Sequence, residues 1–289
     1  MDRVTRTRLE RMLGSELLSA QSMGGGHGVL HYRLTLAGGR QAFAKVQDQD
    51  HSGNGHEAFA AEAHSLRWLG EAGAAPVPAV LGSDPACLVT DWIDTGRPTP
   101  DAARTFGREL ARLHAAGAAT FGALWRGTIA GLPLPNHPAD SWPGWYAVNR
   151  LLPYVRIASD AGTLSPADAR LIESAAARSA ELAGPPEPPS RIHGDCWSGN
   201  VLWSGGRGWL IDPAAHGGHR ETDLAMLALF GAPFLDQVLA AYTDASPLAD
   251  GWRTRVPLHQ LHPLLVHVCL FGGSYRDAAL GAARAVLAA

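Results

Sequence analysis

The 289-residue sequence predicts an α+β protein with two lobes. Short β-type runs are concentrated in residues 1–92, which predicts a small N-terminal lobe with an antiparallel sheet and one main helix. Apolar residues at helical spacing dominate residues 93–289, which predicts a larger, mostly helical C-terminal lobe. Gly96, Pro98 and Pro100 mark the boundary between the two patterns. The length suits one large domain or two lobes around a sizeable core.

The N-terminal lobe begins with a predicted hairpin. Residues 29–36 and 41–46 are β-type runs joined by Gly38 and Gly39, a pattern typical of two antiparallel strands. The glycine-rich segment 24–28 precedes them, and its backbone amides could cover phosphates, although glycine runs are also common in plain loops. Apolar residues at helical spacing predict a helix over 57–70, and the run 87–93 predicts a further strand.

The C-terminal lobe is predicted to be helical over five ranges and to contain one hairpin around 201–211, the helical ranges being 101–116, 165–183, 222–230, 234–243 and 257–288. A stiff proline-rich connector, 184–190, leads into the stretch that is richest in polar side chains.

Composition excludes several classes of protein. The net charge of −3 and the pI of about 6.5 give no broad basic surface for nucleic acid. No run approaches the ~18 apolar residues of a membrane span, and the charged first 20 residues do not resemble a signal peptide. The three cysteines are odd in number and far apart, as expected in a reducing compartment. We therefore expect a cytoplasmic protein without a nucleic-acid or membrane partner; the oligomeric state stays open.

Lys45 is the single lysine among 24 basic residues, all the others being arginine. Its retention suggests a site where a compact ammonium is required, although chance alone could leave one lysine. Glu62 lies in the apolar stripe of the predicted helix 57–70, and a buried carboxylate needs a partner. Lys45 on the neighbouring predicted strand is the expected partner; the alternative is a partly solvated Glu62 at the edge of the stripe.

The stretch from His193 to Asp212 contains most of the candidate catalytic and metal-binding side chains. Its two apolar triplets flank a glycine-rich turn, so Asn200 and Asp212 stand immediately before and after a predicted hairpin. These two positions meet at the open end of a hairpin. An amide and a carboxylate held together there offer oxygen ligands for Mg²⁺. Asp195 lies five residues before Asn200, in the loop that enters the same end.

This order of residues matches the kinase template for phosphoryl transfer. In that template one aspartate accepts the proton of the acceptor hydroxyl, which here is the role of Asp195. An asparagine and a second aspartate hold the Mg²⁺ that bridges the phosphates of ATP, which here are Asn200 and Asp212. Lys45 is then expected to contact the nucleotide phosphates, and Glu62 to brace it.

The segment His193-Gly194-Asp195-Cys196-Trp197-Ser198-Gly199-Asn200 resembles the signature of the fructosamine kinase (ketosamine-3-kinase) family. Residues 212–214 with 218–226 are similar to the second motif of the same family. This family lies within the aminoglycoside-phosphotransferase superfamily. The resemblance implies a protein-kinase-like two-lobed fold. It also implies ATP-dependent phosphorylation of the sugar 3-hydroxyl of ketoamines such as fructosamines or ribulosamines, which promotes deglycation. Cys196 departs from the leucine that is usual in the signature.

The resemblance also assigns Thr90, Asp91 and Trp92 to an inter-lobe hinge, where backbone groups would bind adenine. Trp197 adjoins Asp195 and could form a wall of the sugar pocket, a buried core position being the alternative.

Three further residues, His216, His219 and Glu221, follow closely after Asp212 in the sequence and could face the substrate. His193 is expected to brace the catalytic loop, and Asp223 to cap a helix or tether the loop.

Two alternative functions stay open at this point. The first is a phosphotransferase for another hydroxylated amine, such as an aminoglycoside or choline, which the Trp-Ser-Gly-Asn extension of the motif disfavours. The second is a non-catalytic, nucleotide-binding pseudokinase, which the complete set of catalytic residues disfavours. The sequence does not reveal which ketoamine is preferred, or whether free or protein-bound adducts are the substrate.

Overall fold

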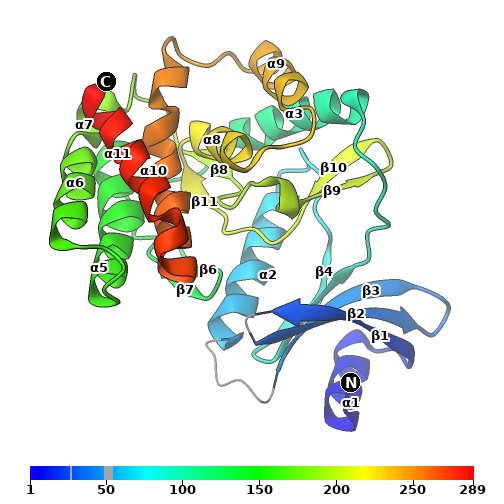
Figure 1. Cartoon of the computed structure of the whole chain (residues 1–289). Helices are drawn as coiled ribbons and strands as arrows, with labels where there is room; N and C mark the ends of the chain where they lie inside the picture. The colour runs from blue at the N-terminus through cyan, green and yellow to red at the C-terminus, as the bar shows by residue number, and fades with distance from the viewer. Residues whose placement is uncertain (27, 49–54) are drawn as a thin grey trace.

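The computed structural model describes residues 1–26, 28–48 and 55–289. Its N-terminal part is a five-stranded antiparallel sheet in the order β1-β2-β3-β5-β4 (Figure 1). The elements of this part are α1 (Arg3–Leu13), β1 (Leu17–Gly26), β2 (Val29–Leu36), β3 (Gln41–Gln47), α2 (Gly55–Glu71), β4 (Val80–Asp84) and β5 (Cys87–Asp91).

The predicted hairpin is formed by β2 and β3. Gly38 and Gly39 both have positive φ angles, 85° and 83°, which glycine adopts without steric cost. The register pairs Lys45 of β3 with His31 on one side and with Leu88 of β5 on the other. Lys45 is therefore on the central strand of the sheet.

The C-terminal part is mostly helical, as predicted, with three small two-stranded sheets. Its larger helices are α3 (Pro100–Ala115), α5 (Leu152–Asp160), α6 (Pro166–Ala177), α8 (Glu221–Phe230), α9 (Leu235–Ala245), α10 (Trp252–Phe271) and α11 (Arg276–Ala288). The shorter helical elements are α4 (Trp142–Tyr146), η1 (Ala147–Leu151), α7 (Ser179–Leu182), η2 (Ser198–Asn200) and η3 (Gly272–Tyr275). The strands are β6 (Gly127–Ile129), β7 (Leu132–Leu134), β8 (Ser190–Ile192), β9 (Val201–Ser204), β10 (Arg207–Leu210) and β11 (His216–Gly218).

Several elements differ from the sequence prediction. Helix α1 and strand β1 were not expected, and neither were the helices between residues 142 and 160. The predicted helix 257–288 is divided into α10 and α11, because Gly272 adopts a φ of 70° that ends the first helix. The division of the chain at residues 92 and 93 stays a prediction.

Helix α2 lies between the sheet and the helical part (Figure 1), and it makes several side-chain contacts with the helical part. The Ser65 hydroxyl accepts a hydrogen bond from the Ala215 amide at 3.3 Å, and the Trp68 and Trp125 rings meet edge to face at 5.5 Å. The Arg191 guanidinium lies 4.4 Å from the centre of the Trp68 ring. These contacts fix the position of α2 relative to the loop that carries Asp212.

Among the residues that the structure describes, no helix combines the length and the apolar character that crossing a bilayer requires.

Candidate active site

The expected contact between Lys45 and Glu62 is present, and a second carboxylate joins it. The Lys45 Nζ lies 2.9 Å from both carboxylate oxygens of Glu62 and 2.7 Å from Asp212 Oδ1. Burial alone would lower the pKa of Lys45, but the two carboxylates outweigh it and hold that pKa above its usual range. Burial raises the pKa of Glu62 to about 7, with Asp212 adding to the rise. Two carboxylates thus share one ammonium, which favours an additional cation nearby.

Asp195 and Asn200 are in direct contact at the start of the β9–β10 hairpin. The Asn200 Nδ2 donates to the Asp195 backbone carbonyl at 2.9 Å and to its Oδ2 at 2.8 Å. Burial raises the pKa of Asp195 to about 7, and the negative charges of Asp212 and Asp223 add to the effect. A carboxylate with a pKa near neutrality can accept a proton in the transition state and release it afterwards.

The loop that carries Asp195 is braced by His193 and Asp223. The His193 Nε2 lies 2.9 Å from the Ile211 carbonyl, which can only accept, so Nε2 carries the proton. The His193 Nδ1 therefore accepts from the Asp195 amide at 3.2 Å. The buried Asp223 carboxylate accepts from the His193 and Gly194 amides at 2.7 and 2.9 Å. Asp223 thus tethers the loop, which is one of the two roles expected for it.

Asp212 and Asn200 fit a Mg²⁺ site. Both line the same cavity as Asp195, as the hairpin geometry predicted. Since both acceptors of the Asn200 amide group are oxygens, its nitrogen faces Asp195 and its oxygen faces away. Asp212 has a φ of 54°, an uncommon conformation outside glycine that occurs often at functional sites, and its side chain is 41% exposed. A carboxylate and an amide oxygen are the ligands that Mg²⁺ prefers.

Two adjoining cavities share Lys45, Glu62 and Asp212 in their walls. The first, of about 530 Å³, is lined by Asp195 and Asn200, by glycines of the segment 24–28, and by Trp197. Residue 27 of that segment lies outside the described residues. The second, of about 320 Å³, is largely apolar and is lined by Thr90, Asp91 and Trp92. The predicted phosphate and hinge residues therefore line these two adjoining cavities, which together are called the cleft.

The side chains of the hinge residues make contacts of their own. The Asp91 carboxylate pairs with Arg40 at 2.8 Å. The Trp92 indole NH donates to Asp94 at 2.8 Å, and the Arg33 guanidinium lies 4.5 Å from the centre of that ring. The chain leaves the sheet after Asp91, so backbone groups beyond it are outside the sheet ladder. This supports the expectation that backbone groups, rather than side chains, would meet the adenine.

Of the four residues expected to contact the substrate, only Trp197 lines the larger cavity. Trp197 lines the larger cavity with 39% of its surface exposed, so the core alternative is wrong for it. His216, His219 and Glu221 are almost fully buried and do not line that cavity. His216 is on strand β11, Glu221 is at the start of α8, and His219 is in the connection between these elements. All three side chains lie in the interior, so nearness to Asp212 in the sequence does not place them at the cleft.

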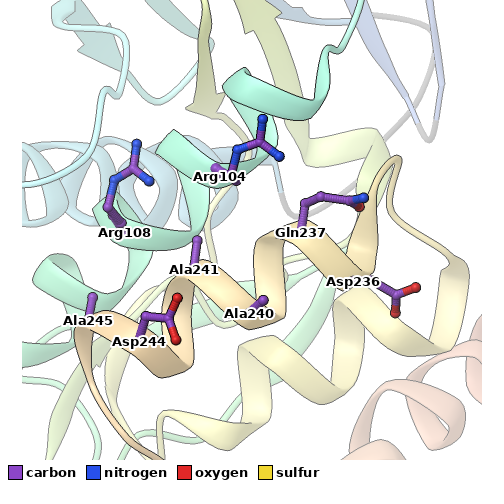
Figure 2. A pocket seen from close by; sticks show the side chains of 8 residues that line it. All are labelled: Arg104, Arg108, Asp236, Gln237, Ala240, Ala241, Asp244 and Ala245. Atoms are coloured by element: carbon purple, nitrogen blue, oxygen red, sulfur yellow. The ribbon is translucent and has the colours of Figure 1, made fainter.

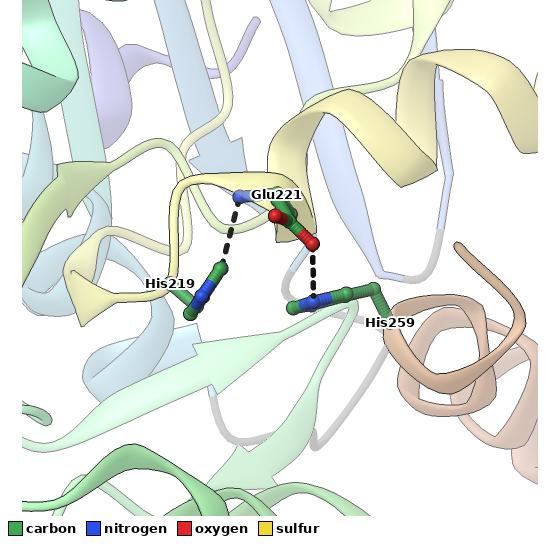
Figure 3. Close-up of side chains that lie close together, drawn as sticks. All are labelled: His219, Glu221 and His259. Carbon is green, nitrogen blue, oxygen red and sulfur yellow. Dashed lines mark hydrogen bonds and ion pairs between the residues drawn. The ribbon is translucent and has the colours of Figure 1, made fainter. Parts of the chain in front are cut away.

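His219, Glu221 and His259 form a buried group of side chains that lie close together (Figure 3). Glu221 accepts from both the Nε and one terminal nitrogen of Arg255, at 2.9 and 2.5 Å, so its charge is already neutralised. The His219 Nδ1 accepts from the Glu221 amide at 3.3 Å, which places the ring proton on Nε2 and leaves no free lone pair for a metal. The arrangement is that of a buried ion pair covered by neutral imidazoles.

Buried neutral histidines should make the folded protein less stable in acid. Burial holds the pKa of His193, His216, His259 and His262 below the usual value and that of His219 at about 3. The unfolded chain therefore binds protons below about pH 6.5 while the folded chain does not, so stability falls as the pH falls. For His219 alone we expect a loss of about 1 kcal/mol between pH 7 and pH 5.5, measured by urea unfolding as the difference between the wild-type protein and His219→Gln. The difference removes the opposite contribution of Asp195 and Glu62, whose raised pKa values stabilise the folded state as the pH falls. An equal pH dependence of the free energy of unfolding in the two proteins would contradict the burial of a neutral His219 ring.

Part of the cleft comes from residues that sequence reasoning missed. The turn after β6, with Ala130 and Gly131, and the C-terminal end of α10, with His267 and Phe271, also line the larger cavity. These segments carry no motif, and only their position in the fold brings them to the site.

A shallow depression on the outer face of α3 and α9 lies apart from this cleft (Figure 2). Its floor is formed by Ala240 and Ala241, and Arg104, Arg108 and Asp244 stand at its rim. No member of the predicted site lines it.

The chain is similar to known proteins along its whole length. The chain matches the family described as fructosamine kinase over residues 1–289. A "Probable ketoamine kinase" of Lactiplantibacillus plantarum is 32% identical over 283 residues, 95% of this chain and 96% of that protein. Another, of Synechocystis, is 36% identical over 195 residues, 66% of this chain and 64% of that protein.

Solved structures extend the likeness to the fold. The crystal structure of a "putative fructosamine-3-kinase" of Thermobifida fusca superimposes on this structure with a TM-score of 0.96. The two sequences are 50% identical, and the match covers 100% of each chain. A choline kinase of Streptococcus pneumoniae, 16% identical with a TM-score of 0.66 and 99% coverage of both chains, shares the fold alone. This chain therefore shares the overall fold of both proteins. Because the family match spans the whole chain, the protein belongs to the fructosamine kinase family.

Proposed function

We propose that this protein transfers the γ-phosphoryl group of ATP to the 3-hydroxyl of ketoamines such as fructosamines or ribulosamines. The observation that carries the proposal is the shared cleft, in which Asp195, Asn200 and Asp212 face one cavity and Lys45 connects it with the apolar pocket beside the hinge. The phosphate destabilises the adduct between sugar and amine, so the reaction would serve deglycation of free or protein-bound amines.

The apolar pocket at Thr90, Asp91 and Trp92 would hold the adenine, which leaves the phosphates directed toward Lys45. The Lys45 ammonium is already positioned by Glu62, so it need not be ordered when ATP binds. The glycines of the segment 24–28 would approach the phosphates closely with their backbone amides.

Asn200 and Asp212 would hold Mg²⁺ through their side-chain oxygens, with the shared negative charge around Lys45 favouring the cation. When bound, Mg²⁺ supplies neutralisation of the negative charge on the phosphates.

Asp195 would orient the acceptor hydroxyl and take its proton as the oxygen bonds to phosphorus. Asn200 holds one oxygen of this carboxylate, and Asp223 and His193 hold its backbone. Trp197, next to Asp195 on the cavity wall, would stack against the sugar.

An ADP-release assay with a panel of acceptors tests the proposal. The panel contains fructosamines, ribulosamines, the corresponding free sugars, choline and an aminoglycoside, each with Mg²⁺ and ATP. We expect ADP release with the ketoamines and little with the free sugars, which lack the amine. Release with choline or the aminoglycoside alone would contradict the proposed acceptor, and release with none of the panel would favour the pseudokinase alternative.

A further inference from the structure

A continuous group of aromatic rings extends from Trp197, and three of its members, Trp197, His267 and Phe271, line the larger cavity. Trp197 meets Phe230 with ring centroids 6.1 Å apart, and Phe230 meets His267 at 4.8 Å. His267 contacts Phe271 at 5.5 Å and Tyr275 at 4.7 Å. We call Phe230, His267, Phe271 and Tyr275 the outer aromatic wall.

The wall presents apolar surface to the cavity. Phe271 is 50% exposed at the C-terminal end of α10, and it lines the cavity together with Val266, His267 and Leu270. An exposed phenyl ring beside a cavity that already holds the catalytic carboxylate is surface that a ligand can cover. The wall therefore adjoins Trp197 through Phe230, and its His267 and Phe271 line the same cavity as Asp195.

Gly199 leaves room for the indole of Trp197. The Cβ that an alanine would add at Gly199 would lie only 2.2 to 2.5 Å from three carbons of the Trp197 indole. A side chain at this position would therefore displace the indole from its place over the backbone.

Formal charge is absent from this side of the cavity apart from Asp195. Among the described lining residues, the turn 128–131 and the end of α10 contribute no lysine, arginine, aspartate or glutamate. The His267 Nδ1 donates to the Pro263 carbonyl at 2.7 Å, and burial lowers the pKa of this ring, so His267 is neutral at pH 7. An anionic group bound here would lose hydration without gaining a cationic partner.

We propose that the outer aromatic wall is a subsite for the substituent on the amine side of the acceptor, and that it selects an uncharged, apolar substituent over one that bears a carboxylate. This inference rests on the proposed function, because the sugar hydroxyl must lie at Asp195 for the amine side to reach the wall. The alkyl chain of a lysine side chain has the required chemistry. The carboxylate of a free α-amino acid adduct lacks it.

Two matched adducts of fructose test the subsite. The amine component of one is 3-methylbutylamine and that of the other is β-alanine. The two substituents have nearly the same shape, but the first ends in an apolar isopropyl group and the second in a carboxylate. KM and kcat are measured for both at saturating ATP and Mg²⁺. We expect the KM of the apolar adduct to be lower by about tenfold or more, since each buried methylene contributes a factor of about four.

Two variants locate the effect. Phe271→Ala should raise the KM of the apolar adduct about fivefold with kcat little changed. The KM of the β-alanine adduct should stay within about twofold of the wild-type value. Phe271→Arg should lower the KM of the β-alanine adduct, because the arginine supplies a cationic partner for the carboxylate. Leu124→Ala, at a side chain that is 93% exposed and does not line the cavity, is the matched control and should change neither KM.

The outcomes separate the two proposals. If the wild-type protein phosphorylates both adducts with equal KM, or if Phe271→Ala affects both equally, the subsite is wrong while the proposed function stands. If no ketoamine is phosphorylated, the proposed function fails and the subsite fails with it.

Discussion

The variant Asp195→Asn is expected to lower kcat by about 10²- to 10⁴-fold, because it removes the group that accepts the proton of the acceptor hydroxyl. The amide oxygen at position 195 can still accept the hydrogen bond that Asn200 Nδ2 donates, so the loop should keep its geometry. Nucleotide affinity should be nearly unchanged, since Lys45 and the hinge lie on the other side of the phosphates. ADP release and equilibrium titration with a non-hydrolysable ATP analogue measure the two quantities separately.

Asp277→Asn is the matched control, because the Asp277 side chain is 90% exposed on α11. It should retain full turnover. If Asp195→Asn retained turnover within about threefold of the wild-type value, Asp195 would not be the proton acceptor.

The variant Asp212→Asn is expected to have a comparably large effect, by a different route. It removes the charged ligand of the proposed Mg²⁺ site, so the Mg²⁺ concentration for half-maximal activity should rise, and kcat should fall by at least about 100-fold. The folded state should persist, because Lys45 keeps its contacts with both oxygens of Glu62 at 2.9 Å. Activity measured against Mg²⁺ concentration and a thermal unfolding curve test both parts.

Glu57→Gln serves as the control, since Glu57 is half exposed on the first turn of α2. It removes one carboxylate without touching the cleft and should leave the Mg²⁺ dependence unchanged. An unchanged Mg²⁺ dependence in Asp212→Asn itself would contradict the assignment of Asp212 as a metal ligand.

The features of the fold that could be predicted are those that local physics determines. Two β-type runs around Gly38 and Gly39 can form little other than a tight hairpin, and the apolar stripe of 57–70 requires a helix with a buried face. Helix α1 escaped prediction because its sequence is rich in arginine and only Thr5 and Leu9 are buried. Its contacts with the sheet are tertiary contacts, which the local sequence pattern does not predict.

The same distinction applies to the candidate site. Asp195, Asn200 and Asp212 lie within 18 residues of one another around one hairpin, so chain geometry alone brings them together. Glu62 could be paired with Lys45 because an unpaired buried carboxylate is costly. His216 and His219 lie closer to Asp212 in the sequence than Asn200 does, yet strand β11 and the residues that follow it are buried in the interior. The outer aromatic wall comes from helices far along the chain, and its rings meet only in the folded protein.

The most direct test of the whole account is a ³¹P NMR spectrum of the reaction with ATP, Mg²⁺ and a fructosamine. We predict that a phosphate monoester resonance coupled to the proton on sugar carbon 3 grows as ATP is consumed by the wild-type protein, and that it is absent with Asp195→Asn. A spectrum that shows inorganic phosphate alone, or an ester formed equally well by Asp195→Asn, would contradict phosphoryl transfer to the sugar by this site.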